Sequence, residues 1–222
     1  MTSRRYTDRR DAGRELAAML DGQRGVEGLI VLGLPRGGVP VANEIARALD
    51  APLEVLVVRK VGLPEQPEVA MGAIASIAGT IETVRNPDVL AHAHGTPDEV
   101  FGRVASVEAA ELRRRQDAFR GDRPPLELDG RTVVLVDDGI ATGATMRAAL
   151  TAARAAAPAR LIVAVPVALS DTARRMGELA DEVVCAWEAR QLWAVGEAYR
   201  DFTQTTDDEV RRILAEAAER QG

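Results

Sequence analysis

An uninterrupted apolar run at residues 133–136 ends in two acids and a turn of small residues, and a helix-forming stretch follows directly. A run with no polar residues in alternation predicts a strand that is covered on both faces, which is typical of a parallel sheet. In such sheets, ligands bind beyond the carboxyl ends of the strands. The segment therefore favours an α/β domain whose functional groups come directly after this strand.

The rest of the chain repeats this alternation of short apolar runs with amphipathic stretches. Strands are expected at residues 29–32, 53–58, 72–76, 133–136, 161–167 and 182–186. Helices are expected at residues 8–20, 39–49, 97–119, 144–156, 171–179 and 207–220. A length of 222 residues fits one domain, so we expect a single domain over residues 1–222. The pattern predicts an α/β fold with a mostly parallel central sheet and helices on both faces.

Composition excludes several classes of protein. The net charge is −6, which argues against a nucleic-acid partner, because such proteins usually carry a basic face. Cys185 is the only cysteine and there are two histidines, so no intrachain disulfide and few types of metal site are possible. No apolar run approaches the roughly 20 residues of a membrane span, and the N-terminus is too charged for a secretory signal. We expect a cytoplasmic protein without a membrane partner.

The turn after the two acids suits an anion. Its small residues let backbone N–H groups converge, the following helix adds its positive end, and two threonines add hydroxyl donors. The turn is therefore predicted to bind a phosphomonoester. Its residues are Gly139, Ile140, Ala141, Thr142, Gly143, Ala144 and Thr145.

The acids themselves, Asp137 and Asp138, would repel that phosphate. At the end of a strand they can instead accept hydrogen bonds from vicinal hydroxyls, as an acid does for ribose in dinucleotide-binding folds. A phosphate and a diol on one short loop indicate a ribose 5-phosphate group. The segment is neither a Walker A loop nor a Gly-x-Gly-x-x-Gly turn. The alternative is a simple strand–helix turn with two exposed acids.

The segment VVLVDDGIATGATM resembles the phosphoribosyl pyrophosphate (PRPP) signature of type I phosphoribosyltransferases. The resemblance implies the fold of that family, with a core at about residues 28–167 and a small hood region, residues 1–27 and 168–222. It implies Mg²⁺-dependent transfer of a 5-phosphoribosyl group from PRPP to a nitrogenous acceptor, a purine or another nucleobase, with release of pyrophosphate. The layout resembles an uncharacterised bacterial subgroup, and residues 91–123 lie outside the minimal family core.

The resemblance also assigns cations to the pyrophosphate. Arg36, Gly37 and Gly38 follow the strand at residues 29–32 and resemble the family's pyrophosphate loop. Arg59 and Lys60 end the strand at residues 53–58, and Lys60 is the one lysine among 28 basic residues. Residues 62–69 would form a mobile lid. A solvated charge pair is the alternative for Arg59 and Lys60.

Roles in the reaction follow from the resemblance. Asp137, Asp138, Arg36 and Lys60 are the expected catalytic residues, and the two aspartates would contact Mg²⁺ indirectly, through PRPP or water. The acceptor would contact Ile140 and one or more C-terminal aromatic residues, although a small satellite core is the alternative for each aromatic. These are Trp187, Trp193, Tyr199 and Phe202. A homodimer is also expected, since dimers are common in the family.

A protein of another class would use the same loop differently. A PRPP-sensing regulator would keep the phosphate turn and use it as a switch without transferase activity. Such a protein would be expected to carry a basic face or an additional nucleic-acid-binding domain, and it could lose the cations of the pyrophosphate loop. This chain is acidic and keeps both Arg36 and Lys60. The enzyme is therefore the favoured hypothesis.

Overall fold

The computed structural model describes residues 6–67, 69–77, 80–92, 94–120 and 127–221. Its centre is a five-stranded sheet in the order β2-β1-β6-β7-β8, in which every neighbouring pair is parallel. The strands are β1 (Leu29–Gly33), β2 (Leu53–Val55), β6 (Thr132–Val136), β7 (Arg160–Leu169) and β8 (Glu182–Ala189). The parallel sheet predicted from the apolar runs is confirmed.

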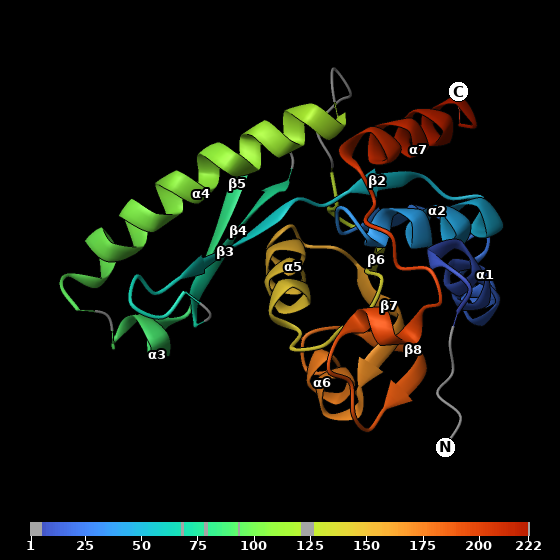
Figure 1. Ribbon diagram of the computed structural model, residues 1–222. Coiled ribbons are helices and arrows are strands. Elements are labelled where there is room, and N and C mark those ends of the chain that lie inside the picture. Colours follow the sequence, from blue (N-terminus) through green and yellow to red (C-terminus); the bar gives the residue numbers. More distant parts are fainter. Residues whose placement is uncertain (1–5, 68, 78–79, 93, 121–126, 222) are drawn as a thin grey trace.

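Helices cover both faces of this sheet (Figure 1). Successive residues of a strand point to opposite faces, so Ile30 and Val133 pack with one set of helices, and Val31 and Val134 pack with the other. The first set is α5 (Ala144–Ala155) and α6 (Ser170–Met176). The second set is α1 (Arg9–Met19), α2 (Gly38–Leu49) and α7 (Asp207–Glu219). All five helices lie within a few residues of the ranges that the sequence predicts.

Helix ends explain some of these boundaries. The side chain of Asp8 caps α1 by accepting a hydrogen bond from the backbone N–H of Asp11. Thr206 caps α7 in the same way, through the N–H of Glu209. Both residues satisfy an N–H group that has no partner within its own helix.

The prediction of one strand over residues 53–58 is wrong. β2 ends at Val55, and β3 (Val58–Gly62) begins a second, antiparallel sheet with β4 (Ala70–Ile77) and β5 (Thr80–Arg85). Leu56 and Val57 connect the two sheets and are both buried, so the apolar run continues across the break without a polar signal. β5 was not predicted from the sequence, because its residues are half-exposed or exposed and form no apolar run.

The second sheet projects from the body of the molecule together with α4 (Pro97–Arg120), and we call these four elements the arm (Figure 1). The long predicted helix at residues 97–119 is thus α4. Phe101 and Leu112 bury its apolar side among residues of β3 and β4, while Ala75 and Ile77 of β4 belong to the cluster that contains α5. A short helix, α3 (Pro87–Leu90), follows β5. Residues 93 and 121–123 of the predicted insertion, residues 91–123, lie outside the described residues.

The predicted lid, residues 62–69, joins β3 to β4, and its residue Glu68 lies outside the described residues. The N–H of Leu63 donates to the carbonyl of Val69 at 2.9 Å. The two segments of the predicted hood, residues 1–27 and 168–222, contact each other: the N–H of Tyr6 donates to the carbonyl of Ala198 at 2.7 Å. Tyr6 and Tyr199 belong to a third apolar cluster, which also includes residues of the 3-10 helix η2 (Val195–Ala198).

In the described part of the chain, no helix is long and apolar enough to cross a membrane.

Candidate functional site

The site lies where β1 and β6 end. Gly33 and Val136 are register partners at the carboxyl ends of these parallel strands, so the turns that follow start side by side. The N–H of Leu34 donates to the carbonyl of Val136 at 2.9 Å, which links the turns at their first residues. The sequence places Arg36, Gly37 and Gly38 on one turn and the two acids on the other, and the parallel register brings them together.

Contact between the two turns requires glycine. A Cβ atom on Gly37 would lie 2.6 Å from Cγ of Asp138, and one on Gly38 would lie 2.6 Å from the carbonyl oxygen of Val136. Real Cβ atoms do not approach other atoms so closely, so a side chain at either position would push the turns apart. The peptide bond between Pro35 and Arg36, directly before these glycines, is cis.

Both acids point toward protein groups. Oδ1 of Asp137 accepts a hydrogen bond from the backbone N–H of Asp138 at 2.8 Å. Oδ2 of Asp138 accepts one from Nε of Arg9, also at 2.8 Å, and the side chain of Asp138 is 14% exposed. The hydroxyl of Tyr199 donates to the backbone carbonyl of Asp138. Asp138 is therefore held by Arg9 and Tyr199, which are far apart in the sequence.

The surroundings of the two acids shift their pKa values upward. Burial raises the pKa of Asp137 well above its ordinary value, and the neighbouring charge of Asp138 raises it further. Burial also raises the pKa of Asp138, although the ion pair with Arg9 opposes this shift. Hydrogen bonds from neutral hydroxyl groups, or a nearby cation, would stabilise the charged form of two carboxylates that lie so close together.

The predicted phosphate turn surrounds a hollow of about 110 Å³. Gly143, with a φ of 78°, takes the left-handed conformation that lets the chain turn into α5. Thr142 and Thr145 are exposed, and Ile140 is buried, with its N–H bonded to the carbonyl of Val167. The lining residues are Asp137, Gly139, Ile140, Ala141, Thr142, Gly143, Ala144, Thr145 and Met146. The structure thus brings all seven predicted phosphate residues together with the first acid.

The predicted pyrophosphate cations lie on two different parts of the structure. Arg36, on the turn after β1, has its Nη1 atom 3.6 Å from Oδ1 of Asp207 at the start of α7. Arg59 and Lys60 stand on β3 of the arm and line a cavity of about 410 Å³ that Thr145 also lines. Arg59 forms an ion pair of 2.7 Å with Glu108 of α4. The phosphate turn therefore borders both the small hollow and the cavity that holds Arg59 and Lys60.

The four aromatic residues divide into two groups. Tyr199 and Phe202 stack with ring centroids 5.0 Å apart and lie beside the acid pair, because the hydroxyl of Tyr199 contacts Asp138. Trp187 packs against the third apolar cluster from β8, and Trp193 is 91% exposed. Tyr199 contacts the acid pair directly, and Phe202 reaches it through Tyr199 and Arg9.

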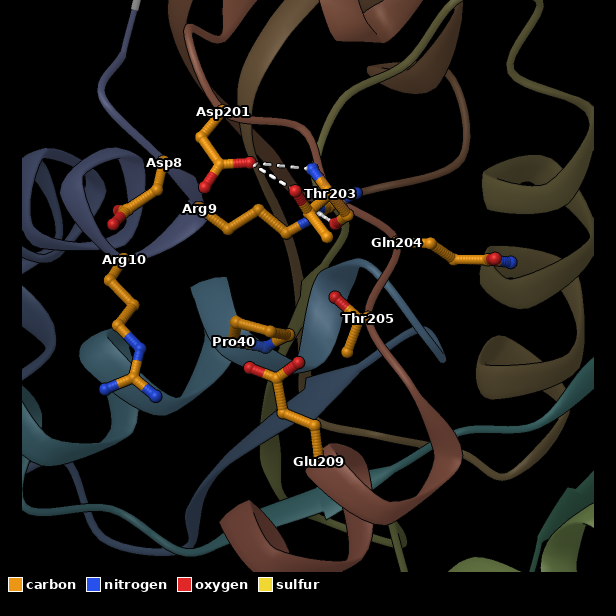
Figure 2. A pocket seen from close by; sticks show the side chains of 9 residues that line it. All are labelled: Asp8, Arg9, Arg10, Pro40, Asp201, Thr203, Gln204, Thr205 and Glu209. Carbon is orange, nitrogen blue, oxygen red and sulfur yellow. Dashed lines mark hydrogen bonds between the residues drawn. The ribbon is translucent and has the colours of Figure 1, made fainter.

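Arg9 is the residue of this site that sequence reasoning missed. Its Nη1 donates to the carbonyl of Thr203 at 2.8 Å, and its guanidinium lies 4.0 Å from the ring centroid of Phe202. Figure 2 shows Arg9 reaching from the start of α1 toward Thr203, beside a polar pocket of about 180 Å³. With 27 arginines in the chain, nothing in the sequence distinguishes this one. The lining residues of the pocket are Asp8, Arg9, Arg10, Pro40, Asp201, Thr203, Gln204, Thr205 and Glu209.

A divalent cation at the acid pair would need ligands in addition to these two carboxylates. Across the described ranges, no group of three or more His, Cys, Asp or Glu side chains could hold a metal ion. Mg²⁺ often binds through one or two carboxylates together with substrate phosphates and water. Asp137 and Asp138 therefore fit an ion that arrives with a phosphorylated substrate.

Comparison with known proteins identifies the family of this chain. The family model of the phosphoribosyl transferase domain matches residues 5–200. A Mycobacterium tuberculosis (strain H37Rv) protein named "Putative phosphoribosyl transferase Rv0571c" is 48% identical over 212 residues, which cover 96% of this chain and 47% of that protein. This chain thus spans about half the length of that curated relative.

Two further relatives cover more of their own length. The crystal structure of TT1426 from Thermus thermophilus has a TM-score of 0.85 and 45% sequence identity, covering 96% of this chain and 98% of that chain. The "Bifunctional protein PyrR" of Leifsonia xyli subsp. xyli is 30% identical over 159 residues, covering 68% of this chain and 66% of that protein. From the family match and these identities, the chain belongs to the phosphoribosyl transferase family, as the paired acids and phosphate turn predict.

Proposed function

We propose that this chain transfers a 5-phosphoribosyl group from PRPP to a nitrogenous acceptor and releases pyrophosphate. One observation carries the proposal: Gly37 and Gly38 lie against Asp138 and Asp137, beside the hollow of the phosphate turn. A single ligand with a diol, a phosphate and a diphosphate would satisfy all three groups at once. Membership of the family supports the same reaction.

In this reaction the bond between C1 of the ribose and the pyrophosphate oxygen breaks, and its electron pair leaves with pyrophosphate. A nitrogen of the acceptor forms the new bond to C1 and loses its proton to the departing pyrophosphate or to water. Because the ribose becomes cationic as the bond breaks, the protein must neutralise the leaving group and exclude water. Arg36 beside the glycine turn, and Arg59 and Lys60 on β3, would carry the first task. Residues 62–69 would close for the second.

The remaining groups orient the donor. Asp137 and Asp138 would accept hydrogen bonds from the ribose hydroxyls, and the backbone amides of residues 141–145 with the hydroxyls of Thr142 and Thr145 would hold the 5-phosphate. A bound Mg²⁺ would neutralise diphosphate charge. The acid pair would contact this ion through PRPP or water. Tyr199 and Phe202 are the aromatic residues best placed to stack on a purine or another nucleobase, and we propose a homodimer as the assembly.

The proposal is tested by pyrophosphate release. Wild-type protein is incubated with PRPP, Mg²⁺ and each member of a panel of purine and pyrimidine bases, and pyrophosphate is measured. We expect release with at least one base. The double variant Asp137→Asn/Asp138→Asn should bind no PRPP by calorimetry, and an unchanged affinity would contradict the role of the acids.

A PRPP-sensing regulator is the second candidate, because one relative carries the name of a bifunctional protein. A regulator would bind PRPP in the same calorimetry experiment but release no pyrophosphate with any base. The retained cations Arg36 and Lys60 favour the enzyme, since a sensor does not have to stabilise a leaving group.

A further inference from the structure

We propose that Arg9 is a positioning residue: it holds Asp138 against the glycine turn so that the second carboxylate oxygen can receive a ribose hydroxyl. This inference rests on the proposed function, because it concerns the acid pair that would bind the diol of PRPP. The arginine belongs to the N-terminal hood rather than to either of the loops that make up the family motif.

The guanidinium of Arg9 is fixed by three different contacts. Nε donates to Oδ2 of Asp138 at 2.8 Å, Nη1 donates to the carbonyl of Thr203 at 2.8 Å, and the ring of Phe202 lies 4.0 Å from the guanidinium carbon. The side chain is only 11% exposed. A long arginine side chain loses considerable conformational freedom when it is held in this way, so one surface ion pair would not be expected to order it. The planar guanidinium suits this combination of two hydrogen bonds and one ring contact.

Asp138 needs such a partner because of its neighbours. Asp137 precedes it directly, and the repulsion between two buried carboxylates favours rotation of one of them toward water. Gly37 lies against the same carboxylate, on the side of Oδ2, at a distance that leaves no room for a Cβ atom. Arg9 offsets the charge of Asp138 and holds Oδ2 in place beside Gly37. It bonds to one of the two carboxylate oxygens, which leaves Oδ1 for a substrate hydroxyl.

The backbone of Asp138 is held from the same direction. The hydroxyl of Tyr199 donates to its carbonyl, and Tyr199 stacks on Phe202, the ring that also contacts Arg9. Arg9 and Tyr199 therefore both contact Asp138, although they are far apart in the sequence. The diol site would be complete only when both hood segments are in place.

Ligands that differ in one group separate this role from a general effect on folding. Ribose 5-phosphate carries the diol that Asp138 would bind, whereas pyrophosphate carries none and would bind at residues 36–38. The affinity of each ligand and of PRPP is measured by calorimetry in the presence of Mg²⁺, for wild type, Arg9→Gln and Arg9→Lys. Arg14→Gln is the matched control, since Arg14 lies on the same helix, is 60% exposed and pairs with Asp11.

We expect Arg9→Gln to lower the affinities for ribose 5-phosphate and PRPP by about tenfold or more, because a charge-assisted hydrogen bond is lost. The affinity for pyrophosphate should stay within about twofold of the wild-type value. Arg9→Lys should be intermediate, because an ammonium group restores the charge but not the bond to Thr203. Arg14→Gln should match the wild type for all three ligands.

Other outcomes overturn the inference. An equal loss of pyrophosphate affinity would make Arg9 a structural residue, unchanged affinity for ribose 5-phosphate would remove its role, and tighter binding would show that Arg9 competes with the ribose. A wild type that binds no PRPP would instead refute the proposed function itself. If Arg9→Gln does not fold, Phe202→Leu removes the supporting ring and leaves the ion pair, and it should give a smaller loss confined to the same two ligands.

Discussion

Gly37 lies directly against Asp138: a Cβ atom on the glycine would come within 2.6 Å of Cγ of the aspartate. The turn after β1 and the turn after β6 thus share one van der Waals surface at this point. Replacement of Gly37 by alanine must displace the carboxylate or the turn. We expect Gly37→Ala to reduce PRPP affinity by at least about tenfold, since a displacement of about 1 Å in a binding site can cost a hundredfold.

A glycine outside the site provides the control for this variant. Gly102 lies within α4, and no described atom comes within 4 Å of a Cβ atom at that position. Gly102→Ala should keep the wild-type affinity for PRPP and raise the free energy of unfolding by about 0.5–1 kcal/mol, because alanine is the better helix former. Calorimetric titration with PRPP and urea unfolding measure the two effects. Wild-type PRPP affinity in Gly37→Ala would contradict a shared site.

The sequence could predict the two turns but not their contact. The apolar runs predict parallel strands, and the residues after them could be assigned because each group has a local signature: glycines, paired acids, hydroxyls before a helix. Strand order is a long-range property, and the neighbourhood of β1 and β6, separated by about a hundred residues, becomes visible only in the register of Gly33 with Val136. The resemblance to the phosphoribosyltransferase family led to the expectation that the two turns share one site, which local sequence patterns could not predict.

The phosphate turn depends on the left-handed conformation of Gly143. Its φ is 78°, and a Cβ atom there would lie 2.8 Å from Cγ2 of Thr172. Gly143→Ala should lower the free energy of unfolding by roughly 1–2 kcal/mol from the backbone alone, and it should also weaken ribose 5-phosphate binding. Gly130, with a φ of 67° and no described atom within 4 Å of such a Cβ, is the control. Gly130→Ala should show the stability loss in urea without the loss of affinity, and similar affinities for both variants would argue against a phosphate site.

Asp137 should reduce the stability of the fold in order to serve the site. Burial raises its pKa above the unfolded value, so the folded protein holds the proton more tightly than the unfolded chain does. The resulting destabilisation is absent below the unfolded pKa, near 3.9, and grows as the pH rises toward the folded pKa. Asparagine carries no charge at any pH. Asp137→Asn is therefore expected to raise the urea midpoint at pH 7, with a difference from wild type that shrinks as the pH falls toward 4.

Asp171 is the control for this pH series, since its side chain is 83% exposed on α6. Asp171→Asn should change the urea midpoint little at any pH in the series. A gain for Asp137→Asn that becomes larger at low pH would reverse the predicted sign. The expected pattern, a more stable protein that no longer binds PRPP, is typical of residues selected for function rather than for stability.

Two parts of the structure have no local signature at all. Arg9 is one arginine among 27, and its importance comes from tertiary contacts with Asp138, Thr203 and Phe202. The break between β2 and β3 falls inside a continuous apolar run, because Leu56 and Val57 remain buried as the chain passes from one sheet to the other. Burial alone therefore cannot reveal that the chain leaves the central sheet.

The arm that results is held together by Phe101. This residue of α4 is 1% exposed, and its ring lies so close to Gly72 of β4 that a Cβ atom there would be 2.6 Å away. Truncation leaves a cavity that close-packed neighbours cannot fill, so Phe101→Ala should lower the free energy of unfolding by about 3–5 kcal/mol in urea. Val107, on the same helix but 68% exposed, is the control, and Val107→Ala should change stability by less than about 0.5 kcal/mol. Because the Glu108 carboxylate on α4 pairs with Arg59 on β3, a loosened arm should also weaken pyrophosphate binding in Phe101→Ala. Equal stability of the two variants would mean that α4 does not anchor the arm.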